Sequence, residues 1–132
     1  MDILIVEDEP IIAISLAVIL ESAGHTIIGP VRTRHEAIEL CREHRPTIAL
    51  LDINLEGRLD GVGLARTLQQ QGIPSVFVSA QHAQAFANQD VALGYIAKPY
   101  TAMNVCESLE IVAGMLAGRP PPAKTGALEV FR

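Results

Sequence analysis

The sequence feature that most constrains the fold is a series of short, wholly apolar runs spaced along the chain. Residues 3–6 and 48–51 contain no polar side chain, and residues 76–78 form a third such run. Runs without a polar position are typical of strands buried on both faces, as in a parallel sheet covered by helices on two sides. Aromatic residues make up only 4% of the chain, which agrees with an aliphatic core of this kind.

Helix signals fill the intervals between the apolar runs. Pro10 suits the first turn of a helix, and Thr33 precedes Glu36 with the spacing of a capping box. Helices are predicted to start near Pro10, Thr33, Asp60, Gln81 and Thr101. Strands are predicted at residues 3–6, 26–28, 47–51, 76–78 and 95–97. Strands and helices that alternate in this way predict an α/β fold with a doubly wound, five-stranded parallel sheet.

Acidic residues follow two of the predicted strands directly. Glu7 and Asp8 follow the first strand, and Asp52 follows the third. If these strands are parallel neighbours, three carboxylates meet at the sheet edge where doubly wound folds bind their ligands. Two such charges roughly 4 Å apart repel by about 4 kcal/mol at an effective dielectric near 20. The cluster therefore needs a divalent cation, a proton or an ammonium group, and we predict a functional site there.

Composition excludes several classes of function. A net charge of −5 disfavours direct binding of nucleic acid. The longest apolar stretch, residues 11–20, is too short to span a bilayer, and the acidic start of the chain does not resemble a secretory signal. Cys41 and Cys106 have no metal-ligand spacing, and we interpret them as free thiols. We therefore expect a cytoplasmic protein without membrane contact.

Four motifs stand in order at the ends of predicted strands. They are Glu7-Asp8, Leu-Leu-Asp52-Ile-Asn-Leu, Ser79-Ala80 after Val-Phe-Val, and Lys98-Pro99-Tyr100. With these motifs, residues 1–117 resemble the receiver domain of bacterial response regulators in two-component signalling, such as chemotaxis regulators. The resemblance implies a flavodoxin-like three-layer sandwich with strand order 2-1-3-4-5, which sets the first strand beside the third. Residues 118–132 then form a Pro-rich C-terminal tail.

The resemblance implies a chemical role for each motif. Asp52 is expected to accept a phosphoryl group from a sensor histidine kinase or a histidine phosphotransfer protein. Lys98 and Ser79 are expected to contact the phosphoryl oxygens, and the Lys98–Pro99 peptide bond is expected to be cis. Mg²⁺ or Mn²⁺ is expected to be held by Glu7, Asp8, Asp52 and the backbone carbonyl of Asn54. Apart from self-phosphorylation and autodephosphorylation, no enzymatic activity is expected.

The resemblance also implies a switch. Phosphorylation is expected to draw Ser79 toward the phosphoryl group and to let Tyr95 rotate inward. The fourth helix, fifth strand and fifth helix then form the surface that a downstream protein recognises. A homodimer through Ile111 and Met115 on the last helix is left open, because both residues also fit the margin of the core.

Two features depart from the family pattern or extend it. The loop after Asp52 is one residue longer than usual, with Glu56 where proline is common, and Val91-Ala92 replaces the usual Gly-Ala. In the tail, residues 119–122 read Arg-Pro-Pro-Pro and predict an extended spacer. Leu128, Val130 and Phe131 offer the alternative that the tail docks on a partner or on the domain itself. The spacer is the favoured interpretation.

Three functions stay open from the sequence. The first is a stand-alone receiver that passes on phosphoryl groups or binds a partner when phosphorylated, and this is the favoured one. The second is the receiver of a longer DNA-binding response regulator. The third is a Mg²⁺-dependent phosphatase that forms an aspartyl phosphate. It is disfavoured because such enzymes carry a second Asp two residues after the nucleophile, where this chain has Asn54.

Overall fold

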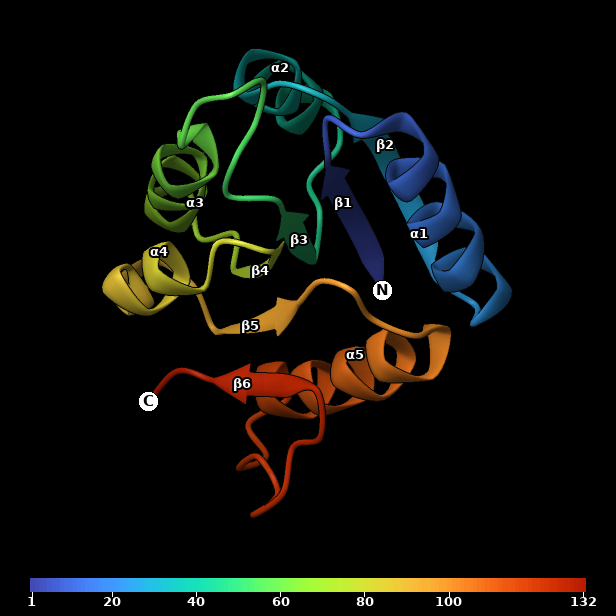
Figure 1. The fold of residues 1–132 in the computed structure, drawn as a ribbon. Helices are drawn as coiled ribbons and strands as arrows, with labels where there is room; N and C mark the ends of the chain where they lie inside the picture. Colours follow the sequence, from blue (N-terminus) through green and yellow to red (C-terminus); the bar gives the residue numbers. More distant parts are fainter.

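One six-stranded sheet forms the centre of the computed structural model, which describes all residues from 1 to 132. Its strand order is β2-β1-β3-β4-β5-β6, and the first five strands run parallel (Figure 1). The strands are β1 (Asp2–Val6), β2 (Thr26–Val31), β3 (Ile48–Leu51), β4 (Ser75–Ser79), β5 (Gly94–Ala97) and β6 (Leu128–Val130). The doubly wound parallel sheet and the order 2-1-3-4-5 are thus confirmed, with one additional strand.

Side chains alternate between the two faces of the sheet, and each face has its own helical cover. On one face, Leu4, Leu51 and Phe77 pack beneath α2, α3 and α4. On the other face, Ile5 and Leu50 pack against α1 and α5. The helices are α1 (Pro10–Ser22), α2 (Arg34–Glu43), α3 (Asp60–Gln70), α4 (His82–Ala87) and α5 (Ala102–Leu116). Every residue of β3 and of β4 is buried, which explains the apolar runs at residues 48–51 and 76–78.

The helix starts follow the local sequence signals. The Thr33 hydroxyl caps α2 by accepting the Glu36 amide at 3.1 Å. Thr101 and Asn104 form a reciprocal capping box at the start of α5. The fourth helix is short: α4 ends at Ala87, and the 3₁₀ turn η1 (Gln89–Val91) follows it. None of the helices has the length and apolarity needed to cross a membrane.

The C-terminal tail corrects one expectation. β6 pairs antiparallel with β5, with Leu128 opposite Ile96 and Val130 opposite Gly94. Leu128 is 2% exposed and joins the core beside α5. The spacer interpretation is therefore wrong for this segment, and the docking alternative describes it. In a five-stranded sheet β5 would be an edge with unpaired backbone groups, and an apolar segment of the same chain pairs with it.

Candidate functional site

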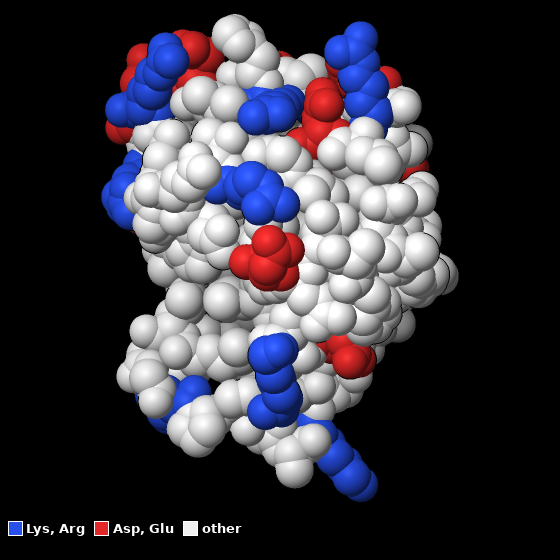
Figure 2. All heavy atoms as spheres, turned by 90° about the vertical axis from the view of Figure 1, so that its left-hand side faces the viewer, with Lys and Arg blue, Asp and Glu red and all other residues white.

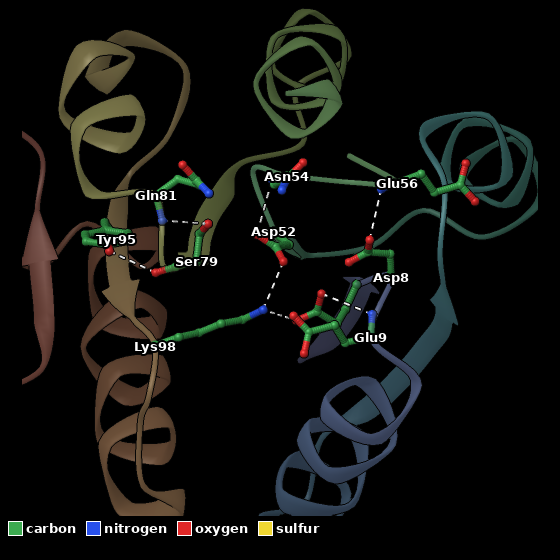
Figure 3. Close-up of polar contacts among 10 residues, drawn as sticks. Asp8, Glu9, Asp52, Asn54, Glu56, Ser79, Gln81, Tyr95 and Lys98 are labelled. Carbon is green, nitrogen blue, oxygen red and sulfur yellow. Dashed lines mark hydrogen bonds and ion pairs between the residues drawn. The ribbon is translucent and has the colours of Figure 1, made fainter. Parts of the chain in front are cut away.

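Parallel pairing of β1 with β3 places the carboxyl ends of these strands side by side. Val6 pairs with Leu51, and the Asp52 amide donates to the Val6 carbonyl at 3.0 Å. The residues that follow the strands therefore meet, as Figure 3 shows. One carboxylate oxygen from each of Glu7, Asp8 and Asp52 lies within 4.8 Å of the other two. This is the acidic cluster that the sequence predicted for the sheet edge.

Lys98 reaches the acidic cluster from the end of β5. Its Nζ donates to Asp52 Oδ2 at 2.9 Å and also forms an ion pair with Glu7 (Figure 3). The side chains of Lys98, Asp52 and Glu7 are 13%, 7% and 4% exposed, so water screens these ion pairs only weakly. The Lys98–Pro99 peptide bond is cis, as expected. One ammonium group thus partly offsets three acidic groups.

Burial and ion pairing shift the pKa values of these groups in different directions. Burial is the largest cause that raises the pKa of Glu7, which reaches about 8. Burial acts the same way on Asp52, but hydrogen bonds with Glu7 and Lys98 outweigh it and lower the pKa of Asp52. For Lys98, hydrogen bonds with both carboxyl groups outweigh burial and raise its pKa. Without a cation, Asp52 is therefore the carboxyl group whose ionised form the site favours, while burial opposes ionisation of Glu7.

The loop between β3 and α3 holds Asp8 in place. Leu55 and Arg58 exchange backbone hydrogen bonds of 2.8 and 3.0 Å, so Glu56 and Gly57 form a two-residue turn. Both turn residues have positive φ, +52° and +75°. The Glu56 amide donates to Asp8 Oδ2 at 3.0 Å. Proline has no N–H and a fixed negative φ, so this turn and its contact with Asp8 both require another residue type.

Ser79 ends β4 and forms another side of the site. Its side chain is buried, and its Oγ accepts the Gln81 amide at 3.2 Å. A cavity of about 120 Å³ lies between this hydroxyl and the acidic cluster. It is lined by Asp8, Glu9, Asp52, Asn54, Ser79, Ala80, Gln81 and Lys98. With the exception of Glu7, which does not line the cavity, the residues predicted for phosphoryl contact and metal binding thus come from four strand ends and surround one cavity.

Tyr95 lies behind Ser79 and is already inside the molecule. Its side chain packs against the core beneath α4, and the whole residue is 3% exposed. The hydroxyl donates to the Ser79 carbonyl at 2.9 Å and lies 2.7 Å from Nδ1 of His82. The inward rotation expected on phosphorylation would need the Tyr95 ring to lie outside the core before phosphorylation. Here any response of Tyr95 has to begin from a buried, hydrogen-bonded ring.

Sequence reasoning missed two residues beside the site. One is His82, whose ring packs edge-on against Tyr95 with centroids 5.4 Å apart and whose Nδ1 lies 2.7 Å from the Tyr95 hydroxyl. Its position three residues after Ser79, at the start of a helix, was the available signal. The other is Gly61, in the first turn of α3. A Cβ there would lie 2.0 Å from the Asp52 carbonyl oxygen, so Gly61 lets α3 pass directly beside the site.

Comparisons with known proteins agree with this geometry. The family model described as the response regulator receiver domain matches residues 3–110. The Phyllosphere-induced regulator PhyR of Methylorubrum extorquens is 36% identical over 107 residues, which cover 79% of this chain and 40% of that protein. The chain thus spans less than half of that relative, and 55% of the next, a transcriptional regulatory protein of Mycobacterium tuberculosis.

Two solved structures are similar along nearly their whole length. The signal receiver domain of a modulated diguanylate cyclase from Desulfovibrio desulfuricans is 35% identical, with a TM-score of 0.79. The similarity covers 88% of this chain and 95% of that one. A CheY-like receiver domain protein from Methanospirillum hungatei is 27% identical, with a TM-score of 0.75 and coverage of 89% and 98%.

Proposed function

The chain belongs to the response regulator receiver domain family, and on this basis we propose that it is phosphorylated on Asp52 and signals through protein–protein contacts. The phosphoryl donor is a sensor histidine kinase or a histidine phosphotransfer protein, and the protein acts in the cytoplasm. The observation that carries the proposal is the ion pair of Asp52 with Lys98 at 2.9 Å beside an open cavity. It holds a carboxylate ionised at the point where a phosphoryl group can enter.

The transfer is a nucleophilic substitution at phosphorus. A carboxylate oxygen of Asp52 forms a bond to phosphorus while the bond from phosphorus to the imidazole nitrogen of the donor breaks. The imidazole leaves with the electron pair of that bond, and the product is an acyl phosphate. Lys98 and the Ser79 hydroxyl stabilise negative charge on the phosphoryl oxygens, because both groups border the cavity.

The charges of the site fit a divalent cation. Three acidic groups face only one ammonium group, and Asp8 lies on the side of the cluster that Lys98 does not contact. Mg²⁺ or Mn²⁺ would be held by Asp8 and Asp52, with Glu7 and the Asn54 carbonyl completing the set. When bound, the ion offsets negative charge on the phosphoryl oxygens.

A donor protein also needs a surface beside the cavity. α1 presents Ile11, Ile14 and Val18 to solvent with exposures of 84%, 62% and 56%. These positions share one side of the helix, and Ile11 also lines a groove of about 490 Å³ that extends to Lys98. We propose that this stripe packs against an apolar helix face next to the donor histidine.

Intact-mass measurement tests the proposed chemistry. After incubation with phosphoramidate and Mg²⁺, the chain is expected to gain one phosphoryl group, and the gain should disappear with EDTA or in Asp52→Asn. The matched control is Asp60→Asn, which removes an acidic side chain outside the cavity and should leave the adduct intact. An adduct that forms equally in Asp52→Asn would refute the assignment of the acceptor.

A separate assay addresses the proposal that the chain is not an enzyme acting on other molecules. Hydrolysis of an added phosphate ester such as p-nitrophenyl phosphate should not exceed that of Asp52→Asn. The expectation follows from Asn54, which cannot serve as the general acid or base that a turnover phosphatase needs. Steady, Asp52-dependent turnover of the ester would restore the phosphatase alternative.

A further inference from the structure

We propose that residues 128–131, here called the tail strand, are an intramolecular ligand that masks the α4-β5-α5 face until phosphorylation weakens their docking. A downstream protein can bind this face only when the tail strand leaves β5. The release step rests on the proposed phosphorylation of Asp52. The masking itself rests on contacts present in the structure.

Backbone pairing shows that β5 is shaped to accept the tail strand. Glu129 lies opposite Tyr95, and the Phe131 amide donates to the Leu93 carbonyl at 2.9 Å. A Cβ on Gly94 would lie 2.6 Å from the Glu129 carbonyl oxygen. Gly94 does not have a positive φ, so its conformation does not require glycine. The absence of a side chain at this position instead allows the tail strand to approach.

Side chains of the tail strand cover apolar groups on both neighbouring helices. Leu128 is buried with Val105 and Leu109 of α5. Phe131 packs edge-on against Phe86 of α4, with ring centroids 5.8 Å apart. Phe86 is 44% exposed even with this cover. Figure 2 views the side of the molecule where α4 lies and shows a broad uncharged area with only scattered charges. Such a surface suits a protein partner better than a nucleic acid.

A continuous set of contacts joins the tail strand to the phosphorylation site. Phe86 lies between Phe131 and Tyr95, and its ring centroid is 6.1 Å from that of Tyr95. The Tyr95 hydroxyl in turn donates to the carbonyl of Ser79 (Figure 3). A shift of Ser79 toward a phosphoryl group therefore alters the support of Tyr95 and of α4. The edge-on contact with Phe131 is the outermost member of this set.

The tether favours docking that is reversible. Eleven residues, 117–127, join α5 to β6 and can extend to about 36 Å. Even a return along the whole of the 15-residue helix α5 would cover only about 22 Å. The tether therefore reaches the β5 edge without strain and keeps the tail strand at a high effective concentration there. A strand of three residues makes few hydrogen bonds, so it can dissociate while the rest of the sheet persists.

Hydrogen exchange on the full chain tests masking first. In the wild type the amides of residues 129–131 that face β5, such as that of Phe131, should be protected, and in Gly94→Val they should exchange about as fast as unpaired amides. The exposed substitution Glu129→Gln is the matched control and should retain protection. Full protection of residues 129–131 in a folded Gly94→Val protein would overturn the inference.

Competition by a peptide tests the same site without mutating β5. A fluorescein-labelled peptide of residues 125–132 should bind Leu128→Asp, whose own tail strand cannot dock, and should bind the wild type at least about tenfold more weakly. Phe131→Ala gives a second, milder opening of the face and should fall between the two. Equal peptide binding to all three proteins, or none to either variant, would contradict masking.

The release step is tested by adding beryllofluoride and Mg²⁺ as a phosphate mimic. Exchange of residues 129–131 should accelerate at least about tenfold, whereas the loop at residues 53–57 should become more protected. If the loop responds and the tail strand does not, release is refuted and phosphorylation stands. If the loop does not respond, the proposed phosphorylation fails and release fails with it, while the Gly94→Val comparison still decides masking.

Discussion

The acidic cluster and the β5–β6 edge belong to the same sheet, but they differ in how many paired strands and buried side chains hold them in place. Asp52 follows β3, a strand buried at all four positions and paired on both sides. β6 has three residues, one neighbouring strand and a single buried position. The proposed chemistry thus lies where the backbone geometry is strongly determined, and the proposed regulation lies where a segment can leave without unfolding the domain.

The largest expected effect comes from comparing one substitution in each of these two regions. Leu51→Ala should lower the free energy of unfolding by about 3 kcal/mol, because it leaves a cavity between the sheet and the helices packed on it, which cannot close without shifting both layers. Leu128→Ala removes an equally buried side chain but should cost only about 1 kcal/mol, because loss of tail docking sets an upper limit on the effect. Urea denaturation measures both values.

Equal losses from the two leucine variants would mean that the tail strand unfolds together with the rest of the domain. The contrast drawn between the two regions would then be wrong.

Two glycine substitutions, one beside the site and one in α5, test how closely α3 packs against the site. Gly61→Ala should lower the free energy of unfolding by about 2–3 kcal/mol, since the added Cβ would lie 2.0 Å from the Asp52 carbonyl oxygen. Gly114→Ala in α5 is the control. Its Cβ would be 3.4 Å from the flexible Arg119 side chain, and it should be neutral or stabilising by up to about 1 kcal/mol. Thermal denaturation of the two variants checks the difference.

Cation binding should stabilise the site region and leave the tail strand unaffected. Mg²⁺ at about ten to thirty times its Kd should raise the free energy of unfolding by about 1–2 kcal/mol. Asp8→Asn should abolish most of this gain, because it removes a carboxylate that Lys98 does not neutralise. Differential scanning calorimetry with Mg²⁺ and with EDTA measures the change. A gain of the same size in Asp8→Asn would place the cation elsewhere.

The smallest expected effect concerns the contact between the two regions. Tyr95→Phe removes the hydroxyl that donates to the Ser79 carbonyl and should cost about 1 kcal/mol of stability. It keeps the ring packed against Phe86, so protection of residues 129–131 should change little in the absence of phosphate mimic. If Tyr95→Phe alone releases the tail strand, the hydroxyl and not the ring contact holds it in place.

Much of the fold and of the site was determined by sequence alone. The apolar runs at residues 3–6 and 48–51 specify strands buried on both faces, because no polar side chain interrupts them. Residues that directly follow such strands have to emerge at one edge of a parallel sheet. The positions of Glu7, Asp8 and Asp52 therefore followed from local pattern, and the resemblance to receiver domains supplied the strand order.

The tertiary structure decided what depends on contacts between distant segments. The sequence of the tail fits both a spacer and a docked strand, and only the unpaired edge of β5 with its side-chain-free Gly94 selects the strand. The inward position of Tyr95 depends in the same way on His82 and on the Ser79 carbonyl. Local periodicity determines which residues are buried. The packed fold determines which partner each exposed backbone group or apolar side chain contacts.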